Sequence, residues 1–340
     1  MNRAIWQKLL SLESRDITQQ RFEQIHSRTL NARRAREINA AARQAREYFR
    51  NGSNSDHSVR PLLTFYGVAS LSRALLLLLK PDGGEEGLNR GHGIEAVRWG
   101  EVVSGGNIDG LPRLNELRIC VRSGLFSDFM KYTRNRMSMH IRSGGVDWRF
   151  CYDLPDHAEQ ISVGDLFSRI PDLWEDYSDL SDVRRHVAVQ DLSYSEDNGL
   201  QVKIRKENSS GIISAYQELG YAAVDDGESC ALTCSADRAE REIPQFVHTY
   251  VNKMFGAIPT LFIAEPFPGG ARYSQLCMTY MVSFVLGMLV RYFPTHWIAL
   301  VQGEKGDSMW PTIVRAQQVV EESYPELVAE MIRDASATGH

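Results

Sequence analysis

The sequence predicts an α+β protein, a helical bundle built from both chain ends that carries a β-rich central insertion. Three observations predict this class. Residues 31–50 and 62–79 have helical composition near the N-terminus, helical character returns from about Tyr273, and short alternating runs lie between them. Such runs, separated by Gly, Asp, Asn and Ser, are typical of antiparallel strands. Because loop closure costs little extra as a loop lengthens, the insertion can separate two ends that pack together.

The length of 340 residues exceeds that of a typical single domain. We therefore expect three segments along the chain: an N-terminal helical part over 1–115, the β-rich insertion over 116–268, and a C-terminal helical part over 269–340 that packs on the first.

The first long helix is predicted over 31–50, where apolar residues recur with helical spacing. An arginine row lies on the opposite arc, formed by Arg36, Arg43, Arg46 and Arg50. The next helix begins at Pro61, which is tolerated in a first turn. Its residues from Leu62 to Leu79 are apolar on nearly every side, which indicates a helix in the middle of the bundle.

The insertion contains the strand-like runs LRICVRSG, MSMHIRS, WRFCYDL, HVAVQDLSY, LQVKIRK and SCALTCS. Short helices are expected within it over Leu125–Tyr132 and Val163–Tyr177, with Pro171 bending or ending a turn. The C-terminal part should contain a long helix to Tyr292, then helical segments over Pro311–Glu322 and Pro325–Ala335.

Composition and motifs narrow the function classes. The formal net charge of -5 gives no global reason to expect nucleic-acid binding, so such binding would need a local basic patch. Five cysteines without a secretory leader predict reduced thiols and a cytoplasmic protein. The apolar runs Leu75–Leu79 and Met281–Val290 are too short to span a bilayer, so no membrane association is expected.

We expect no metal and no cofactor. Cys230 and Cys234 lack a second pair at zinc-site spacing, and the chain has no HExxH. It also has no GxxxxGK[ST] and no strand-linked GxGxxG, the loops that cradle nucleotide phosphates.

Several motifs in order resemble the YaaC-like family of bacterial proteins, whose activity is unassigned. They are Trp6, ARQAREYF, Arg60-Pro61-Leu62-Leu63 followed by Phe65-Tyr66-Gly67, Gly91-His92-Gly93, Gly124-Leu125-Phe126, and the segment from Ser283 to Trp297. These motifs are distributed over most of the chain. The resemblance implies a bacterial origin and a shared fold, and little chemistry.

The helical segments are also similar to HEPN domains, so the bundle is expected to be HEPN-like. Many HEPN proteins cleave RNA without a metal, using an Arg and a His four to six residues apart. Arg291 and His296 fit that spacing, as do Arg134 and His140. An arginine can stabilise phosphate charge and a neutral imidazole can take the proton of a ribose 2′-hydroxyl. Against this role, Pro294 interrupts the helix and Arg291 can instead cap a helix C-terminus.

The segment Gly91-His92-Gly93 is a second candidate site, because glycines on both sides of a histidine let the backbone approach a ligand closely. Together with Arg60 and Arg90, His92 could form an anion site at a helix start. The same glycines could simply turn the chain, with His92 packing on the bundle.

The leading hypothesis for function is a non-catalytic protein-interaction module, as in a stress or phage-defence assembly, with a protein partner or a second copy bound through the Gly91-His92-Gly93 loop and the arginine row. That row could equally be a solvated face that Glu37 and Glu47 partly neutralise. Two alternatives stay open: a metal-independent ribonuclease using Arg291 and His296, with RNA as partner, and a nucleotide or small-molecule sensor near His92.

Overall fold

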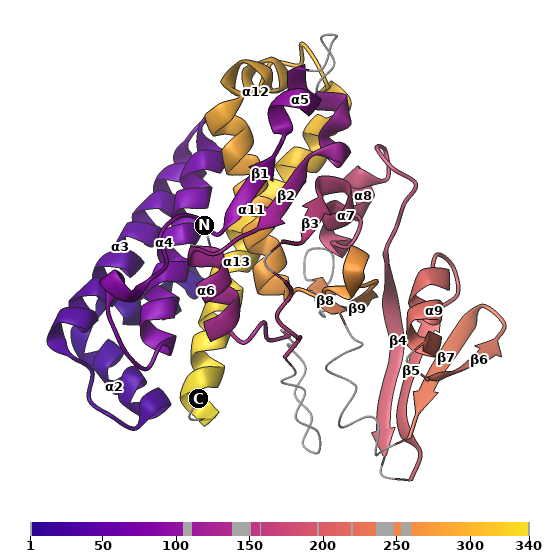
Figure 1. Cartoon of the computed structure of the whole chain (residues 1–340), viewed down its shortest axis with the longest axis horizontal. Helices are drawn as coiled ribbons and strands as arrows, with labels where there is room; N and C mark the ends of the chain where they lie inside the picture. The colour runs from indigo at the N-terminus through magenta and orange to yellow at the C-terminus, as the bar shows by residue number, and fades with distance from the viewer. Residues whose placement is uncertain are drawn as a thin grey trace. The chain divides into compact units, whose positions relative to one another are not determined.

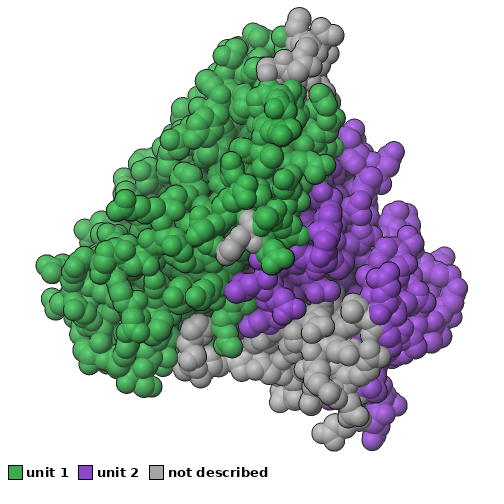
Figure 2. Space-filling model, in the orientation of Figure 1, with its two compact units in different colours: residues 1–134, 156–163, 276–340 green, residues 135–155, 164–275 purple. Residues whose placement is uncertain are grey.

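The computed structural model describes residues 2–104, 111–137, 151–156, 158–195, 197–218, 220–235, 248–252 and 260–338. Its chain divides into two compact units (Figure 2). Unit 1 comprises residues 1–134, 156–163 and 276–340, and unit 2 comprises residues 135–155 and 164–275. The predicted strand Met137–Ser143 and its His140 fall largely outside the described residues.

Unit 1 is a bundle of helices from both chain ends with a small sheet (Figure 1). Its principal helices are α1 (Arg3–Leu9), α2 (Arg15–His26), α3 (Ala32–Asn54), α4 (Arg60–Leu79), α5 (Trp99–Ser104), α6 (Leu125–Tyr132), α11 (Gln275–Tyr292), α12 (Pro294–Val301) and α13 (Trp310–Thr338). The predicted mixed α+β class, with N- and C-terminal helices packed together, is confirmed.

Two glycines let neighbouring helices pack closely around α4. A Cβ on Gly67 of α4 would stand 2.7 Å from the ring of Phe49 on α3, so that ring lies directly on the α4 backbone. Similarly, a Cβ on Gly287 of α11 would stand 2.7 Å from Cβ of Phe65. Helix α4 is therefore held between an N-terminal and a C-terminal helix, as its apolar composition predicts.

Helix α13 completes the bundle through polar contacts with α4. Arg60 donates Nε to Oε1 of Glu321 at 2.8 Å, and its Nη2 pairs with Oε2 of the same carboxylate. Deeper in the bundle, the hydroxyls of Ser72 and Tyr324 form a buried hydrogen bond. These bonds join residues more than 250 positions apart.

Pro294 and Pro325 have different effects on the C-terminal helices. Helix α11 ends at Tyr292, Phe293 has φ -129° and ψ 51°, and Pro294 begins α12. Helix α13 instead continues through Pro325, where the sequence predicts two segments. Tyr324 and Leu327 on either side are both buried, and this packing offsets the lost backbone hydrogen bond.

The small sheet of unit 1 is antiparallel in the order β1-β2-β3. Its strands are β1 (Ile94–Val97), β2 (Arg118–Val121) and β3 (Gln160–Ser162). Strand β1 follows directly on Gly91-His92-Gly93, and β2 leads through Gly124 into α6. The sheet therefore fixes the end of the His92 loop at β1 and places it beside the start of α6.

Unit 2 contains an antiparallel sheet in the order β6-β7-β5-β4-β9-β8. Its elements are α8 (Trp174–Tyr177), β4 (His186–Ser195), β5 (Gly199–Arg205), α9 (Ser210–Glu218), β6 (Ala222–Asp226), β7 (Ser229–Cys234), β8 (His248–Asn252) and β9 (Thr260–Ala264), while α7 (Val163–Phe167) begins at the last residue of unit 1. Leu200, Val202 and Ile204 of β5 are buried in one apolar cluster with Ile212 and Tyr216 of α9. The predicted antiparallel sheet in the centre of the chain is thus present.

Helices α4 and α11 are long and apolar enough to cross a membrane by length and composition. Their length therefore does not exclude a span, contrary to the expectation from the shorter apolar runs. In the structure, however, 72% of the apolar window of α4 and 89% of that of α11 are buried. Packing inside unit 1 accounts for their composition.

Candidate functional site

The segment Gly91-His92-Gly93 is bound tightly to the start of α6. The carbonyls of Gly91 and His92 accept hydrogen bonds from the backbone N–H groups of Leu125 and Phe126, each at 3.0 Å. Gly124 makes this approach possible, since a Cβ there would stand 2.4 Å from the backbone nitrogen of Gly93. The loop is therefore a rigid platform with His92 at its centre.

The imidazole of His92 lies half-buried against aromatic rings of α4 and α11. Its ring centroid is 5.1 Å from that of Phe65 and 6.3 Å from that of Phe284, both in edge-on geometry. Burial, with a further contribution from the positive charge of Arg291, lowers the pKa of His92 below its ordinary value of 6.5. The imidazole is consequently neutral at physiological pH.

Arg291 is exposed in the last turn of α11, where its charge acts on His92 and its side chain contacts two tyrosines. Its Nη1 donates to the hydroxyl of Tyr66 at 3.3 Å, and its guanidinium lies 5.1 Å from the ring centroid of Tyr292. Tyr48 of α3 packs beside Tyr66, with ring centroids 5.6 Å apart. We call Tyr66, His92 and Arg291 the His92 site, with Tyr48 and Tyr292 at its margin.

The structure does not join Arg291 to His296, the partner that its spacing suggested. Among the described residues no hydrogen bond links the two side chains, and His296 lies on α12, beyond the break at Phe293. The ring of His296 packs edge-on against Phe293, with centroids 6.3 Å apart. The sequence objection based on Pro294 is confirmed, because α11 and α12 are separate helices.

Three members of the arginine row on α3 are already paired with carboxylates. Arg43 and Arg46 lie 3.7 and 2.6 Å from Glu13, and Arg50 pairs with Glu47 one turn away. Arg36 is exposed and has no partner in the described part of the chain. The charge of the row is thus largely neutralised within unit 1.

Arg60 and Arg90, proposed from the sequence as anion ligands beside His92, have different surroundings. Nε and Nη2 of Arg60 both donate to the carboxylate of Glu321, whose Oε1 also accepts a hydrogen bond from Gln317 at 2.8 Å. This network raises the pKa of Arg60 and ties α4 to α13. Arg90 is exposed next to Gly91 and has no partner among the residues that the structure describes.

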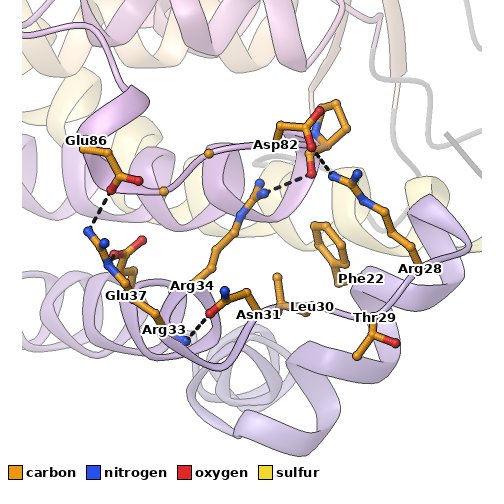
Figure 3. A pocket seen from close by; sticks show the side chains of 13 residues that line it. Phe22, Arg28, Thr29, Leu30, Asn31, Arg33, Arg34, Glu37, Asp82 and Glu86 are labelled. Carbon is orange, nitrogen blue, oxygen red and sulfur yellow. Dashed lines mark hydrogen bonds and ion pairs between the residues drawn. The ribbon is translucent and has the colours of Figure 1, made fainter.

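A cavity of about 360 Å³ lies elsewhere in unit 1, between the start of α3 and the loop after α4 (Figure 3). Arg34 lines it and donates to the carbonyl of Leu77 in the last turn of α4 and to the carbonyls of Lys80 and Pro81 just after the helix. Burial, and secondly Arg28, lower the pKa of Arg34. This buried guanidinium therefore caps the C-terminus of α4 and fixes the loop that follows it.

Unit 2 contains a histidine with a contrasting environment. His186 is 1% exposed, its Nδ1 lies 3.0 Å from the carbonyl oxygen of Ser168, and its Nε2 has no hydrogen-bond partner among the described residues. Since the carbonyl can only accept, Nδ1 carries the proton. Burial lowers the pKa of His186 to about 3. No group of three metal-ligating side chains occurs among the described residues of either unit.

Sequence reasoning missed Tyr66 and the residues around the cavity. The sequence places Tyr66 in a buried helix, although its hydroxyl needs a polar partner. The cavity could have been suspected from the opposite charges of NARRARE at 31–37 and PDGGEE at 81–86, two segments that flank the helical hairpin of α3 and α4.

A family model described as YaaC-like Protein matches residues 10–332. No curated protein and no solved structure matches the chain. The resemblance to that family noted from the sequence is confirmed, whereas the likeness to HEPN domains stays a prediction.

Proposed function

The chain belongs to the YaaC-like protein family, and we propose that it is a non-catalytic interaction module of the bacterial cytoplasm that binds a protein partner through the His92 site. Its partner presents a carboxylate to Arg291 and an apolar or aromatic surface to the tyrosines. A component of a stress or phage-defence assembly is the setting we infer for it.

The single observation that carries this proposal is the state of Arg291. It is exposed, it donates only a 3.3 Å hydrogen bond to the hydroxyl of Tyr66, and it has no carboxylate partner among the described residues. A guanidinium has five N–H donors, so most of its capacity is available to an incoming carboxylate.

The surroundings of Arg291 favour a protein partner. Arginine and tyrosine are enriched among the residues that dominate binding energy in protein interfaces. Tyr292 is 57% exposed beside it, and Tyr66 and His92 are half-buried on rigid supports. Rigid aromatic groups lose little conformational entropy on binding, which favours affinity from a small patch.

Affinity purification from the native host tests the proposal. Tagged wild-type protein should retain a partner that Arg291→Glu loses, because the substitution reverses the charge that meets the partner's carboxylate. Arg36→Glu is the matched control, since Arg36 is also exposed and has no partner in the described part of the chain. Light scattering on the pure protein identifies a second copy as the partner. The proposal fails if both variants retain the same proteins and the same mass.

A metal-independent ribonuclease is the second candidate, and the positive charge of Arg291 acting on the half-buried imidazole of His92 favours it. In this reaction the neutral imidazole of His92 takes the proton of a ribose 2′-hydroxyl, and the resulting oxygen attacks the adjacent phosphorus. The bond to the 5′ oxygen breaks, leaving a 2′,3′-cyclic phosphate, and a proton returns to the departing oxygen. Arg291 stabilises the charge on the phosphate oxygens.

Three variants separate this enzyme from the interaction module. Total RNA incubated with pure protein in EDTA should be cleaved by the wild type and by His296→Ala, but not by His92→Ala or Arg291→Ala. Cleavage lost only in His296→Ala would instead support the pair suggested by spacing. RNA that stays intact with the wild type, including with the captured partner present, eliminates the nuclease.

A further inference from the structure

Helix α4 is buried along most of its length but keeps one face accessible, which begins at Tyr66 of the His92 site. Tyr66, Ala69 and Arg73 follow the i, i+3, i+7 spacing that places side chains on one face of a helix. Tyr66 and Ala69 are partly exposed and Arg73 is exposed, whereas most other residues of α4 are buried. We call these three residues the α4 face.

Helix α3 lies along one side of the α4 face. The ring of Tyr48 packs on that of Tyr66, with centroids 5.6 Å apart. One turn further along α4, Oγ of Ser70 donates to Oε1 of Gln44 at 3.1 Å, and Gln44 is exposed. A partner on the α4 face would therefore meet aromatic rings at one end, and the small side chain of Ala69 lets it approach the helix backbone closely.

An arginine without a carboxylate partner lies at each end of the α4 face. Arg291 contacts Tyr66 through its 3.3 Å hydrogen bond. Arg73 has no hydrogen bond or ion pair with any residue that the structure describes. Because an α-helix rises about 1.5 Å per residue, Tyr66 and Arg73 are about 10 Å apart along α4. The face thus presents two positive charges separated by about two helical turns.

This separation favours a helical partner over an extended one. In an α-helix, residues i and i+7 lie on one face about 10 Å apart, which matches the repeat along α4. In a strand, side chains alternate between faces and each residue advances about 3.3 Å, so residues on one face are about 7 or about 13 Å apart. Carboxylates on a helix therefore match the two arginines better than carboxylates on a strand.

We propose that the α4 face binds an acidic amphipathic helix of the protein partner, with two carboxylates seven residues apart, one on Arg291 and the other on Arg73. An apolar side chain between the two carboxylates packs on Tyr48 and Tyr66. Arginine–carboxylate pairs have a fixed geometry, so two of them set the register of the bound helix. This inference rests on the proposed function and adds the shape and charge pattern of the partner.

Charge reversal in the full chain tests the helix binding. With the partner captured from the host and then purified, Arg73→Glu and Arg291→Glu should each weaken its binding at least tenfold, since each loses a charge-assisted contact. Arg36→Glu, outside the α4 face, should change nothing. An effect of Arg291→Glu without an effect of Arg73→Glu would leave the proposed function intact and overturn the helix binding. No effect of either variant would overturn both.

Photo-crosslinking then identifies the bound segment. A photoreactive phenylalanine analogue in place of Gln44 or of Tyr292 should form adducts with one helical segment of the partner, which carries Asp or Glu seven residues apart. Replacing one of these acidic residues by arginine should restore binding to Arg73→Glu, and replacing the other should restore binding to Arg291→Glu. Adducts in separate segments, another spacing, or no restoration would overturn the inference. Binding lost on ribonuclease treatment would identify RNA as the occupant and overturn it too.

A displayed library of helical peptides tests the α4 face without a native partner. If the wild type retains no partner, the proposed function fails, but the face can still be probed by this selection. Peptides that bind the wild type and not the double variant Arg73→Glu/Arg291→Glu should be enriched in acidic residues seven positions apart. A selection without such enrichment would overturn the helix binding.

Discussion

The arginine row of α3 and the single Arg291 of α11 show how differently arginines can be used in one bundle. The row places Arg43, Arg46 and Arg50 along one helix, but Glu13 and Glu47 take their charge. Arg291 belongs to no row of arginines in the sequence, yet the fold brings Tyr66 of α4 into contact with it and exposes His92 to its charge.

The difference shows that the number of arginines on a helix face is a poor guide to a binding site. Exposed ion pairs are worth little to stability, but they reduce the field that a partner would meet. A guanidinium whose neighbours are a hydroxyl and a neutral imidazole keeps its charge for a partner. The comparison therefore favours the His92 site over the arginine row as the proposed contact surface.

The largest expected effect is a loss of stability from substitutions of the glycines that support the His92 site. Gly124→Ala should destabilise unit 1 by about 3 kcal/mol or more, because its Cβ would meet the backbone of Gly93 at 2.4 Å and its φ is +156°. Gly91→Ala has a similarly restricted φ of +81° but open space around its Cβ, and should cost about 1 kcal/mol. Urea unfolding measures both. Equal costs would mean that close backbone contact does not hold the loop.

The next largest effect is a difference in stability loss between an arginine that has a carboxylate partner within the fold and Arg291, which has none among the described residues. Arg60→Ala should cost about 2 kcal/mol, because the side chain of Glu321 is only 10% exposed and loses its charged partner. Arg291→Ala should cost less than about 0.5 kcal/mol, since it ends one long hydrogen bond at the surface. A stability loss at Arg291 as large as that at Arg60 would show that its charge is used within the fold.

Acid should distinguish the two kinds of histidine. The pKa of His186 is about 3 in the folded chain, against the 6.5 of an ordinary histidine in the unfolded chain, so below pH 6.5 the unfolded state binds a proton that the folded state does not. The free energy of unfolding of unit 2 should therefore decrease as the pH is lowered, by about 1 kcal/mol between pH 7 and pH 5.5. Hydrogen exchange of β4 amides at the two pH values measures this loss.

His186→Phe is the control for the acid effect. It removes the titrating group, and the carbonyl of Ser168 keeps its bond from the backbone N–H of Arg185 at 2.9 Å. The variant should lose most of the pH dependence. If it keeps the full dependence, another group is responsible.

The smallest effect concerns the pKa of His92. Burial lowers it first and Arg291 second, so Arg291→Gln should raise it by part of the total shift. Arg46→Gln, in the paired row, should leave it unchanged. Imidazole chemical shifts followed through a pH titration measure both. A pKa of His92 that does not respond to Arg291 would separate these two members of the site.

The sequence predicts elements with local signals well. Helix α6 has the predicted bounds Leu125–Tyr132, and α4 lies inside the bundle as its apolar composition indicates. Helix α9 (Ser210–Glu218) and strand β1 (Ile94–Val97) were not predicted, because such short elements depend on packing partners more than on periodicity. Packing also explains why Pro325 lies within helix α13 and does not end it, contrary to its local signal.

Only part of the candidate site can be predicted from the sequence. His92 and its glycines were suspected from local backbone chemistry, and their close contact with Gly124 explains those glycines. The pairing of Arg291 with Tyr66 spans 225 positions, and that of Arg60 with Glu321 spans 261. Contacts at this separation leave no periodic signal in one sequence, so spacing suggested His296 as the partner of Arg291 instead.

Photo-crosslinking in the native host tests the contact surface most directly. A photoreactive phenylalanine analogue in place of Tyr292, which is 57% exposed beside Arg291, should form an adduct with the partner. Arg291→Glu in the same chain should abolish that adduct, and the analogue in place of Arg43 on the paired row should form none. An adduct that survives Arg291→Glu, or one that forms from position 43 alone, would contradict the account.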